Sequence, residues 1–110
     1  MESVKTLVVG AGISGLATAA DLIERGDDDV QRAVEAAVER FGGVDIVVNN
    51  ASAIATDRTE DLSAKKFDLM MDINVRGTFL LTKAALPHLQ KSPHAAVLTI
   101  SPPLNMNPYW

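Results

Sequence analysis

The sequence of 110 residues contains no cysteine and carries no excess of positive charge. The absence of cysteine excludes disulfides, thiolate nucleophiles and thiolate metal sites, and it leaves the cellular compartment open. The formal net charge of −4 is opposite in sign to the basic stripe that a nucleic-acid-binding surface normally carries. We therefore expect neither thiol chemistry nor a nucleic-acid partner.

Long hydrophobic runs are also missing, since no apolar stretch approaches the roughly 20 residues that span a bilayer. The N-terminus lacks a basic segment followed by an apolar segment and a cleavage site, so we expect no signal peptide. Apolar residues nevertheless make up 47% of the chain, which favours a hydrophobic core over disorder. These features predict one soluble globular domain of unknown localisation and no membrane partner.

A glycine motif follows the first apolar run. Gly10, Gly12 and Gly15 have the G-x-G-x-x-G spacing, with a predicted strand at residues 6–10 and a predicted helix at 14–25. Glycines at this spacing permit a tight turn, a close approach to a pyrophosphate and close helix–strand packing. The candidate cofactor-binding residues in this motif are Gly10, Gly12, Ile13, Ser14 and Gly15.

Three consecutive aspartates, residues 27–29, precede a second predicted helix. They could bind a metal ion, but carboxylates also cap helix N-termini, and the helix that follows at once favours capping. His88 and His94 lack a third ligand at a suitable spacing, so no metal site is predicted. The apolar stripe expected to face the core on this second helix is Val30, Ala33, Val34, Ala37, Val38 and Phe41.

Two more strands and a long helical region follow. We expect strands at residues 44–49, buried on both faces, and at 95–101. Ser63 or Asp61 should cap the helical region that runs to about Gln90, with a kink or close packing at Gly77 and a local break at Pro87. The apolar face predicted for this region is Phe67, Met71, Val75, Phe79, Leu86 and Leu89.

Three segments resemble the short-chain dehydrogenase/reductase family. They are FGGVDIVVNNA at residues 41–51, MDINVRGT at 71–78 and LTIS at 98–101. Ser52 and the run ISPPLN at 100–105 look most like the hydroxysteroid-dehydrogenase-like branch. The first 26 residues resemble instead the start of FAD-dependent flavoproteins of the amine-oxidase type. We therefore expect a single truncated or chimeric domain, natural or engineered, that joins residues 1–26 to residues 27–110.

The resemblance implies an α/β fold, a minimal Rossmann-like three-layer sandwich. Its parallel sheet should have about three strands, with the first strand at one edge, the second in the middle, and two consecutive helices between them. Strands at the edges of such a short sheet would expose unpaired backbone groups. We therefore expect a homodimer or a dimer that exchanges elements.

Catalysis in the resembled family uses an asparagine, a serine, a tyrosine and a lysine. Asn74 matches the asparagine, and Ser101 lies one position before the usual serine, where this sequence has Pro102. Tyr109 is followed only by Trp110, so the tyrosine–lysine pair is absent from the sequence and Asn74 and Ser101 are remnants of the set. This favours a nucleotide-binding module without turnover over an NAD(P)-dependent oxidoreductase, and a designed chimera without ligand is a third possibility.

The cofactor could be FAD or NAD(P), because the glycine motif favours the first and the remaining sequence the second. Glu35 and Glu39 lie near the distance expected for a ribose anchor but on the outer face of a helix, so binding should be weak or absent. Asn50 and Ala51 follow the second strand and should line the nucleotide site. For Asn49 and Asn50, a structural role and a contact with the cofactor are equally expected.

Overall fold

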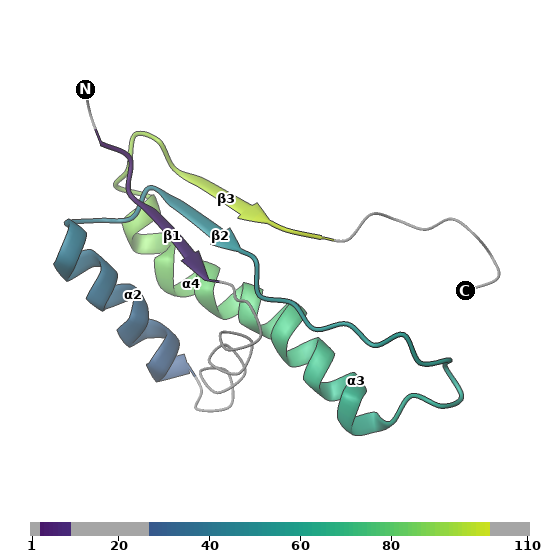
Figure 1. The fold of residues 1–110 in the computed structure, drawn as a ribbon. Helices are drawn as coiled ribbons and strands as arrows, with labels where there is room; N and C mark the ends of the chain where they lie inside the picture. The colour runs from purple at the N-terminus through teal and green to yellow at the C-terminus, as the bar shows by residue number, and fades with distance from the viewer. Residues whose placement is uncertain (1–2, 10–26, 102–110) are drawn as a thin grey trace.

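The computed structural model describes residues 3–9 and 27–101 (Figure 1). Its elements follow in the order β1 (Thr6–Val9), α2 (Asp27–Phe41), β2 (Ile46–Asn49), α3 (Ala64–Met71), the π-helical segment η1 (Asp72–Gly77), α4 (Thr78–Leu89) and β3 (Ala96–Thr99). The predicted helix at 14–25 and the glycine motif lie outside the described residues. The second helix, the long helical region and all three strands are confirmed, with ends within about three residues of the predicted ones.

The strands form a parallel sheet in the order β1-β2-β3. The predicted parallel sheet, with the first strand at one edge and the second in the middle, is confirmed, and the fold is α/β and Rossmann-like. Pairing places Val9, Asn49 and Thr99, the last residues of their strands, at the same level, so the carboxyl ends of all three strands meet at one end of the sheet. Within the described sheet β1 and β3 are the outer strands, and the dimer expected from such edges stays a prediction.

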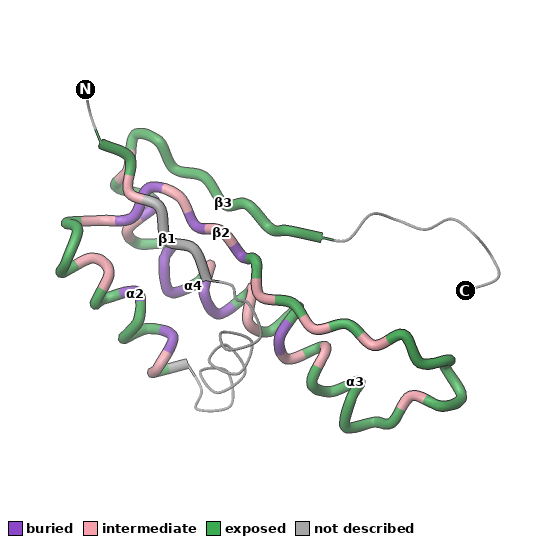
Figure 2. Tube along the Cα trace, viewed as in Figure 1, coloured by how far each residue is buried: buried purple, intermediate pink, exposed green. Residues whose placement is uncertain are grey.

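Helices α2 and α4 pack against each other and lie on the same side of the sheet (Figure 1). The core forms where they meet β2, and Figure 2 shows its buried positions on these three elements. In β2 the buried residues are Val47 and Asn49, which alternate with the half-buried Ile46 and Val48. The prediction that this strand is buried on both faces is therefore met fully on one face only. The core cluster comprises Val30, Val34, Val44, Val47, Leu80, Leu81, Ala84, Ala85 and Leu89.

The long helical region begins as predicted, because the Ser63 hydroxyl accepts a hydrogen bond of 3.3 Å from the backbone N–H of Lys66. Its predicted apolar face is wrong except at Leu89: Phe67, Met71, Val75, Phe79 and Leu86 are all exposed. The buried residues are instead Ile73, Leu80, Leu81, Ala84, Ala85 and Leu89. Two physical causes account for the error. The π-helical turn changes the angular spacing ahead of α4, and α4 carries apolar side chains nearly all round, so spacing alone does not select its inner face.

Pro87 lies within the last turn of α4, and the helix continues to Leu89 without the predicted break. Pro87 lacks the N–H that would bond the carbonyl four residues earlier, and its ring crowds that carbonyl, but only two residues of α4 follow it. Gly77 ends the π-helical segment, where the sequence predicted a kink or close packing. This segment therefore interrupts α-helical spacing while the chain remains helical from Ala64 onward.

Helix α2 departs from its predicted stripe at two positions. Val30 and Val34 are buried, but Ala33 and Phe41 are exposed. Phe41 is the last residue of α2, and the Arg40 guanidinium lies 5.8 Å from its ring centre. Gly42 follows the helix directly; its φ of 82° is readily adopted only by glycine, and its N–H donates to the Val38 carbonyl at 2.7 Å.

The three aspartates lie at the N-terminus of α2, as predicted, but they form its first turn and do not precede it. Asp29 is paired with Arg32 one turn later. Carboxylates at this end of a helix interact favourably with the free N–H groups and the helix dipole. Among residues 3–9 and 27–101 no group of three or more acidic, histidine or cysteine side chains could hold a metal ion.

Candidate functional site

A cavity of about 600 Å³ lies at the carboxyl ends of β2 and β3. It is lined by Asn49, Asn50, Ala51, Ser52, Ala53, Ile54, Met70, Asn74, Thr78, Thr99, Ile100 and Ser101. The structure thus brings together four predicted site residues, Asn50, Ala51, Asn74 and Ser101, from three separate parts of the sequence. The other predicted site residues, Gly10, Gly12, Ile13, Ser14 and Gly15, lie outside the described residues. We call this cavity the strand-end cleft.

The two adjacent asparagines at the end of β2 have different environments. Asn49 is only 4% exposed, and its amide donates to the hydroxyls of Thr82 on α4 at 3.3 Å and Thr99 on β3 at 3.4 Å. It therefore connects three elements beneath the cleft, which is a structural role. Asn50 is exposed, and its side chain makes no hydrogen bond to any residue in the described ranges. Of the two, Asn50 is the one whose amide can meet a ligand.

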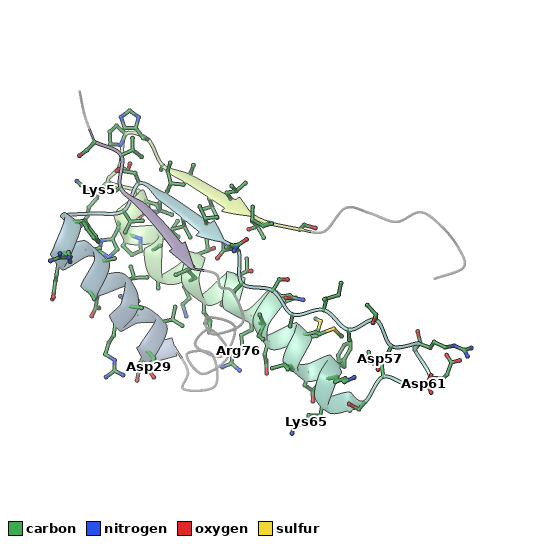
Figure 3. The ribbon with its side chains drawn as sticks, viewed as in Figure 1. Lys5, Asp29, Asp57, Asp61, Lys65 and Arg76 are labelled. Carbon is green, nitrogen blue, oxygen red and sulfur yellow. The ribbon has the colours of Figure 1, made fainter. Side chains whose placement is uncertain are left out.

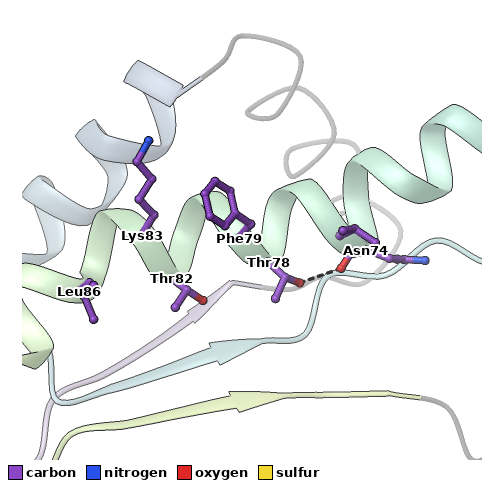
Figure 4. A pocket seen from close by; sticks show the side chains of 7 residues that line it. Asn74, Thr78, Phe79, Thr82, Lys83 and Leu86 are labelled. Carbon is purple, nitrogen blue, oxygen red and sulfur yellow. Dashed lines mark hydrogen bonds between the residues drawn. The ribbon is translucent and has the colours of Figure 1, made fainter.

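Asn74 holds the segment that leaves β2. Its amide donates to the Ala53 carbonyl at 2.7 Å and accepts from the Ala53 N–H at 2.8 Å, so both backbone groups of Ala53 are paired by one side chain. The backbone carbonyl of Asn74 accepts a 2.9 Å hydrogen bond from the Thr78 hydroxyl, drawn in Figure 4. Asn74 lies in the π-helical segment, where the altered spacing sets its side chain toward the strap, which we define as residues 50–57.

The described lining of the strand-end cleft is electrically neutral. It offers amides and hydroxyls as hydrogen-bonding groups, but no carboxylate, imidazole, ammonium or guanidinium group. Such a lining can bind and orient a polar ligand, because amides and hydroxyls both donate and accept hydrogen bonds. It supplies no group that titrates near neutral pH, the range in which general acids and bases work best. The geometry of these residues therefore supports binding.

A buried carboxylate at the opposite end of the sheet, where the strands begin, was not predicted from the sequence. Asp45 is 8% exposed, and its carboxylate accepts from the Lys5 backbone N–H at 2.6 Å and from the Ser92 hydroxyl. These two donors, Ser92 first, hold the pKa of Asp45 below its ordinary value of 3.8, against the opposing effect of burial. The carboxylate thereby joins the entry to β1, the start of β2 and the loop that follows α4. Because Asp45 and the strand-end cleft lie at opposite ends of the strands, we assign Asp45 a structural role.

Replacing Asp45 with asparagine should lower the urea midpoint at neutral pH, because the Lys5 N–H and the Ser92 hydroxyl meet different carboxylate oxygens and asparagine replaces one of these acceptors with an NH2 donor. The lowered pKa means that the carboxylate stabilises the fold above pH 4 and that this contribution is lost as pH falls through the folded-state pKa. The difference between parent and Asp45→Asn should therefore shrink below about pH 4. Urea unfolding between pH 7 and pH 2.5 measures it, with the exposed Asp68→Asn as the control. A difference in stability that is independent of pH would contradict this role of the Asp45 carboxylate.

His88 lies in the last turn of α4, and the exposed His94 lies in the loop before β3. The backbone N–H of His94 donates to the Ser92 hydroxyl at 3.0 Å, which places that loop next to the Asp45 cluster. No helix within the described ranges is long and apolar enough to cross a membrane.

The model of the short chain dehydrogenase family matches residues 17–109. The chain belongs to the short-chain dehydrogenase family. Among curated members it is similar to hydroxysteroid dehydrogenase-like protein 2 of Bos taurus, with 55% identity over 86 residues that cover 78% of this chain and 21% of that protein. The protein of the same name from Mus musculus is 48% identical over 103 residues, 94% of this chain and 21% of that one. The chain thus spans about a fifth of the length of these relatives.

Solved structures of dehydrogenases superpose on this chain. A short chain dehydrogenase from Mycobacterium thermoresistibile superposes with a TM-score of 0.69 at 45% identity, covering 78% of this chain and 31% of that one. An alcohol dehydrogenase from Thermococcus sibiricus complexed with 5-hydroxy-NADP gives the same TM-score at 21% identity, which shows the shared fold alone. It covers 88% of this chain and 57% of that one.

The comparisons give no support to the flavoprotein resemblance of the first 26 residues. The family match begins at residue 17, inside the segment that the glycine spacing assigned to a flavoprotein. The match to the mouse relative extends over 94% of the chain. A chimera with a boundary near residue 26, a designed origin and FAD as cofactor are therefore likewise without support. Glycine spacing alone was misleading because three glycines specify a phosphate-binding turn and not the cofactor attached to the phosphate.

Proposed function

We propose that this chain binds a nicotinamide dinucleotide, NAD(P), in the strand-end cleft. The observation that carries the proposal is the gathering of Asn50, Ala51, Asn74 and Ser101 around one cavity of about 600 Å³ at the carboxyl ends of parallel strands. Ligands of Rossmann-like sheets bind at this edge, and the volume lies within the ordinary range for small-molecule sites. Membership of the short-chain dehydrogenase family supports a nicotinamide cofactor over a flavin.

The strand order supports a site that extends toward β1. Val9 pairs with Asn49, so β1 ends at the same end of the sheet as the cleft, and in the sequence Gly10 follows Val9 directly. In this arrangement the motif would approach the pyrophosphate, while the Asn50 amide would hydrogen-bond a ribose or amide group. The bound cofactor would supply or accept hydride, and the chain's described residues would position it.

Affinity is expected to be weak. Glu39 is exposed on α2, and Glu35, also exposed, accepts a 3.0 Å hydrogen bond from the side chain of Gln31 on the same helix. Both carboxylates therefore lie on the outer face of α2, as the sequence predicted, away from the cleft. A dinucleotide bound without an acidic ribose anchor loses a pair of hydrogen bonds that Rossmann-like sites normally provide.

We propose binding without turnover as the primary activity, because the described lining has no proton donor or acceptor suited to neutral pH. An NAD(P)-dependent oxidoreductase is the second candidate, and family membership favours it. In an oxidoreductase Asn74 and Ser101 would be the retained members of the catalytic set. Hydride transfer separates the two activities.

Calorimetric titration of the 110-residue chain with NADH and NADPH tests the proposal. We expect saturable binding with a Kd of roughly 0.1–1 mM, in the weak range for a site that lacks its ribose anchor. NADH oxidation in the presence of a panel of aldehydes and ketones is followed in parallel at 340 nm. Heat without saturation would rule out the binding site, whereas steady oxidation abolished by Asn74→Ala would replace a binding module with an oxidoreductase.

A further inference from the structure

The strap, residues 50–57, is fastened to the helical region at two points. Asn74 pairs with both backbone groups of Ala53 near one end. At the other end the Lys66 ammonium on α3 donates to both carboxylate oxygens of Asp57, at 3.0 Å each. Within the described ranges, the other hydrogen bonds and ion pairs of residues 54–62 join residues of this same loop to one another, such as Arg58 to Glu60.

The strap lines two neighbouring cavities. A second cavity of about 320 Å³ lies between the strap and α3, and it shares Ala53, Ile54 and Met70 with the strand-end cleft. The Ile54 side chain, which stands at this boundary, is 76% exposed. An apolar side chain so exposed has few packing contacts to fix its position. Its placement therefore depends on the backbone attachments on either side of it.

The pair between Asp57 and Lys66 is suited to this local role. Its side chains are 30% and 55% exposed, and exposed ion pairs add little to global stability because solvent screens them. A bidentate contact nevertheless removes freedom from a segment that has few other attachments. Loss of the pair should thus loosen the strap while the core built by α2, β2 and α4 stays intact.

We propose that the Asp57–Lys66 pair is a positioning latch that holds the strap as the outer wall of the nucleotide cleft. Lys66 acts through Asp57 and the strap backbone, and it does not touch the ligand. The part of the proposal that concerns ligand affinity rests on nucleotide binding at the cleft. The part that concerns strap order stands on the contacts of the chain itself and can be tested without a ligand.

Spin labelling measures the order of the strap directly. Because the chain contains no cysteine, Thr56→Cys provides a single labelling site on the strap, and Glu39→Cys provides a reference site on α2. We expect Lys66→Met to increase the mobility of the label at position 56 and to leave that at position 39 unchanged. Methionine has nearly the helix propensity of lysine, so α3 should persist.

Two variants make the test specific to the ion pair. Lys65→Met removes the neighbouring lysine, which points away from the strap in Figure 3, and should leave the label unchanged. The reversed pair Asp57→Lys with Lys66→Asp should restore the order lost in either single variant, since aspartate is also favourable in the first turn of α3. High salt should raise mobility in the parent and have no further effect in Lys66→Met.

Titration with NADH tests the effect on the cleft. We expect Lys66→Met to weaken NADH binding about threefold, within the range for an exposed pair, with an unchanged melting temperature, and the reversed pair to recover the parent affinity. Unchanged label mobility in Lys66→Met would disprove the latch. Increased mobility with unchanged NADH affinity would disprove its role in the cleft. If the parent binds no NADH, the proposed function fails, while label mobility still decides whether the latch exists.

Discussion

Leu81→Ala should lower the free energy of unfolding by about 3 kcal/mol, within the range of 2–5 kcal/mol for buried leucines. Leu81 is 5% exposed and belongs to the core cluster with Val34 of α2 and Val47 of β2. Truncation removes apolar contacts and leaves a cavity that these neighbours cannot fill without moving. In a chain of this size such a loss is a large fraction of total stability. Urea unfolding followed by circular dichroism measures it.

Leu86→Ala is the matched control, because it removes the same atoms from the same helix. Leu86 is 48% exposed, so its truncation should cost less than about 1 kcal/mol. The two variants together decide which face of α4 lies against the core. Equal losses, or a larger loss for Leu86, would favour the apolar face expected from sequence spacing and contradict the packing of α4 against α2.

This pair of leucines also shows why the fold was predictable and the core only partly so. Strand positions followed from short apolar runs, and the start of α3 followed from Ser63, whose capping bond is a local interaction. The inner face of α4 depends on how Asp72–Gly77 turns, and a π-helical segment has no simple signature in the spacing of apolar residues. Exposure of β3 depends on what covers the sheet, which the sequence of the strand itself does not reveal.

The candidate site divides in the same way. Asn50, Ala51, Asn74 and Ser101 were predicted from motifs, and the structure gathers them at one cleft because parallel strands bring their carboxyl ends together. The pairing of Asn74 with Ala53 and of Asp57 with Lys66 joins residues 21 and 9 positions apart. The Asp45 bond to Lys5 spans 40 positions. Such contacts depend on tertiary geometry, and one sequence without its fold gives no signal for them.

Asn50→Asp should weaken NADH binding about tenfold at low salt, which corresponds to about 1.4 kcal/mol. The substitution keeps the shape of an exposed side chain at the cleft and replaces a neutral amide with a carboxylate. A dinucleotide brings two negative phosphate charges to a cleft whose described lining is otherwise uncharged, so the new carboxylate repels the ligand. Calorimetric titration with NADH in 20 mM and 300 mM salt measures the loss.

If electrostatic repulsion causes the loss of affinity, the loss must depend on the position of the added charge and on the salt concentration. Gln90→Glu adds the same charge at an exposed position after α4, at the opposite end of the sheet from the cleft. This variant should change NADH affinity less than twofold, because salt screens interactions between charges more than about 10 Å apart. The deficit of Asn50→Asp should shrink in 300 mM salt, where the screening length is shorter. Parent affinity in Asn50→Asp at low salt would remove Asn50 from the site and leave the glycine motif to bind the nucleotide without this cleft.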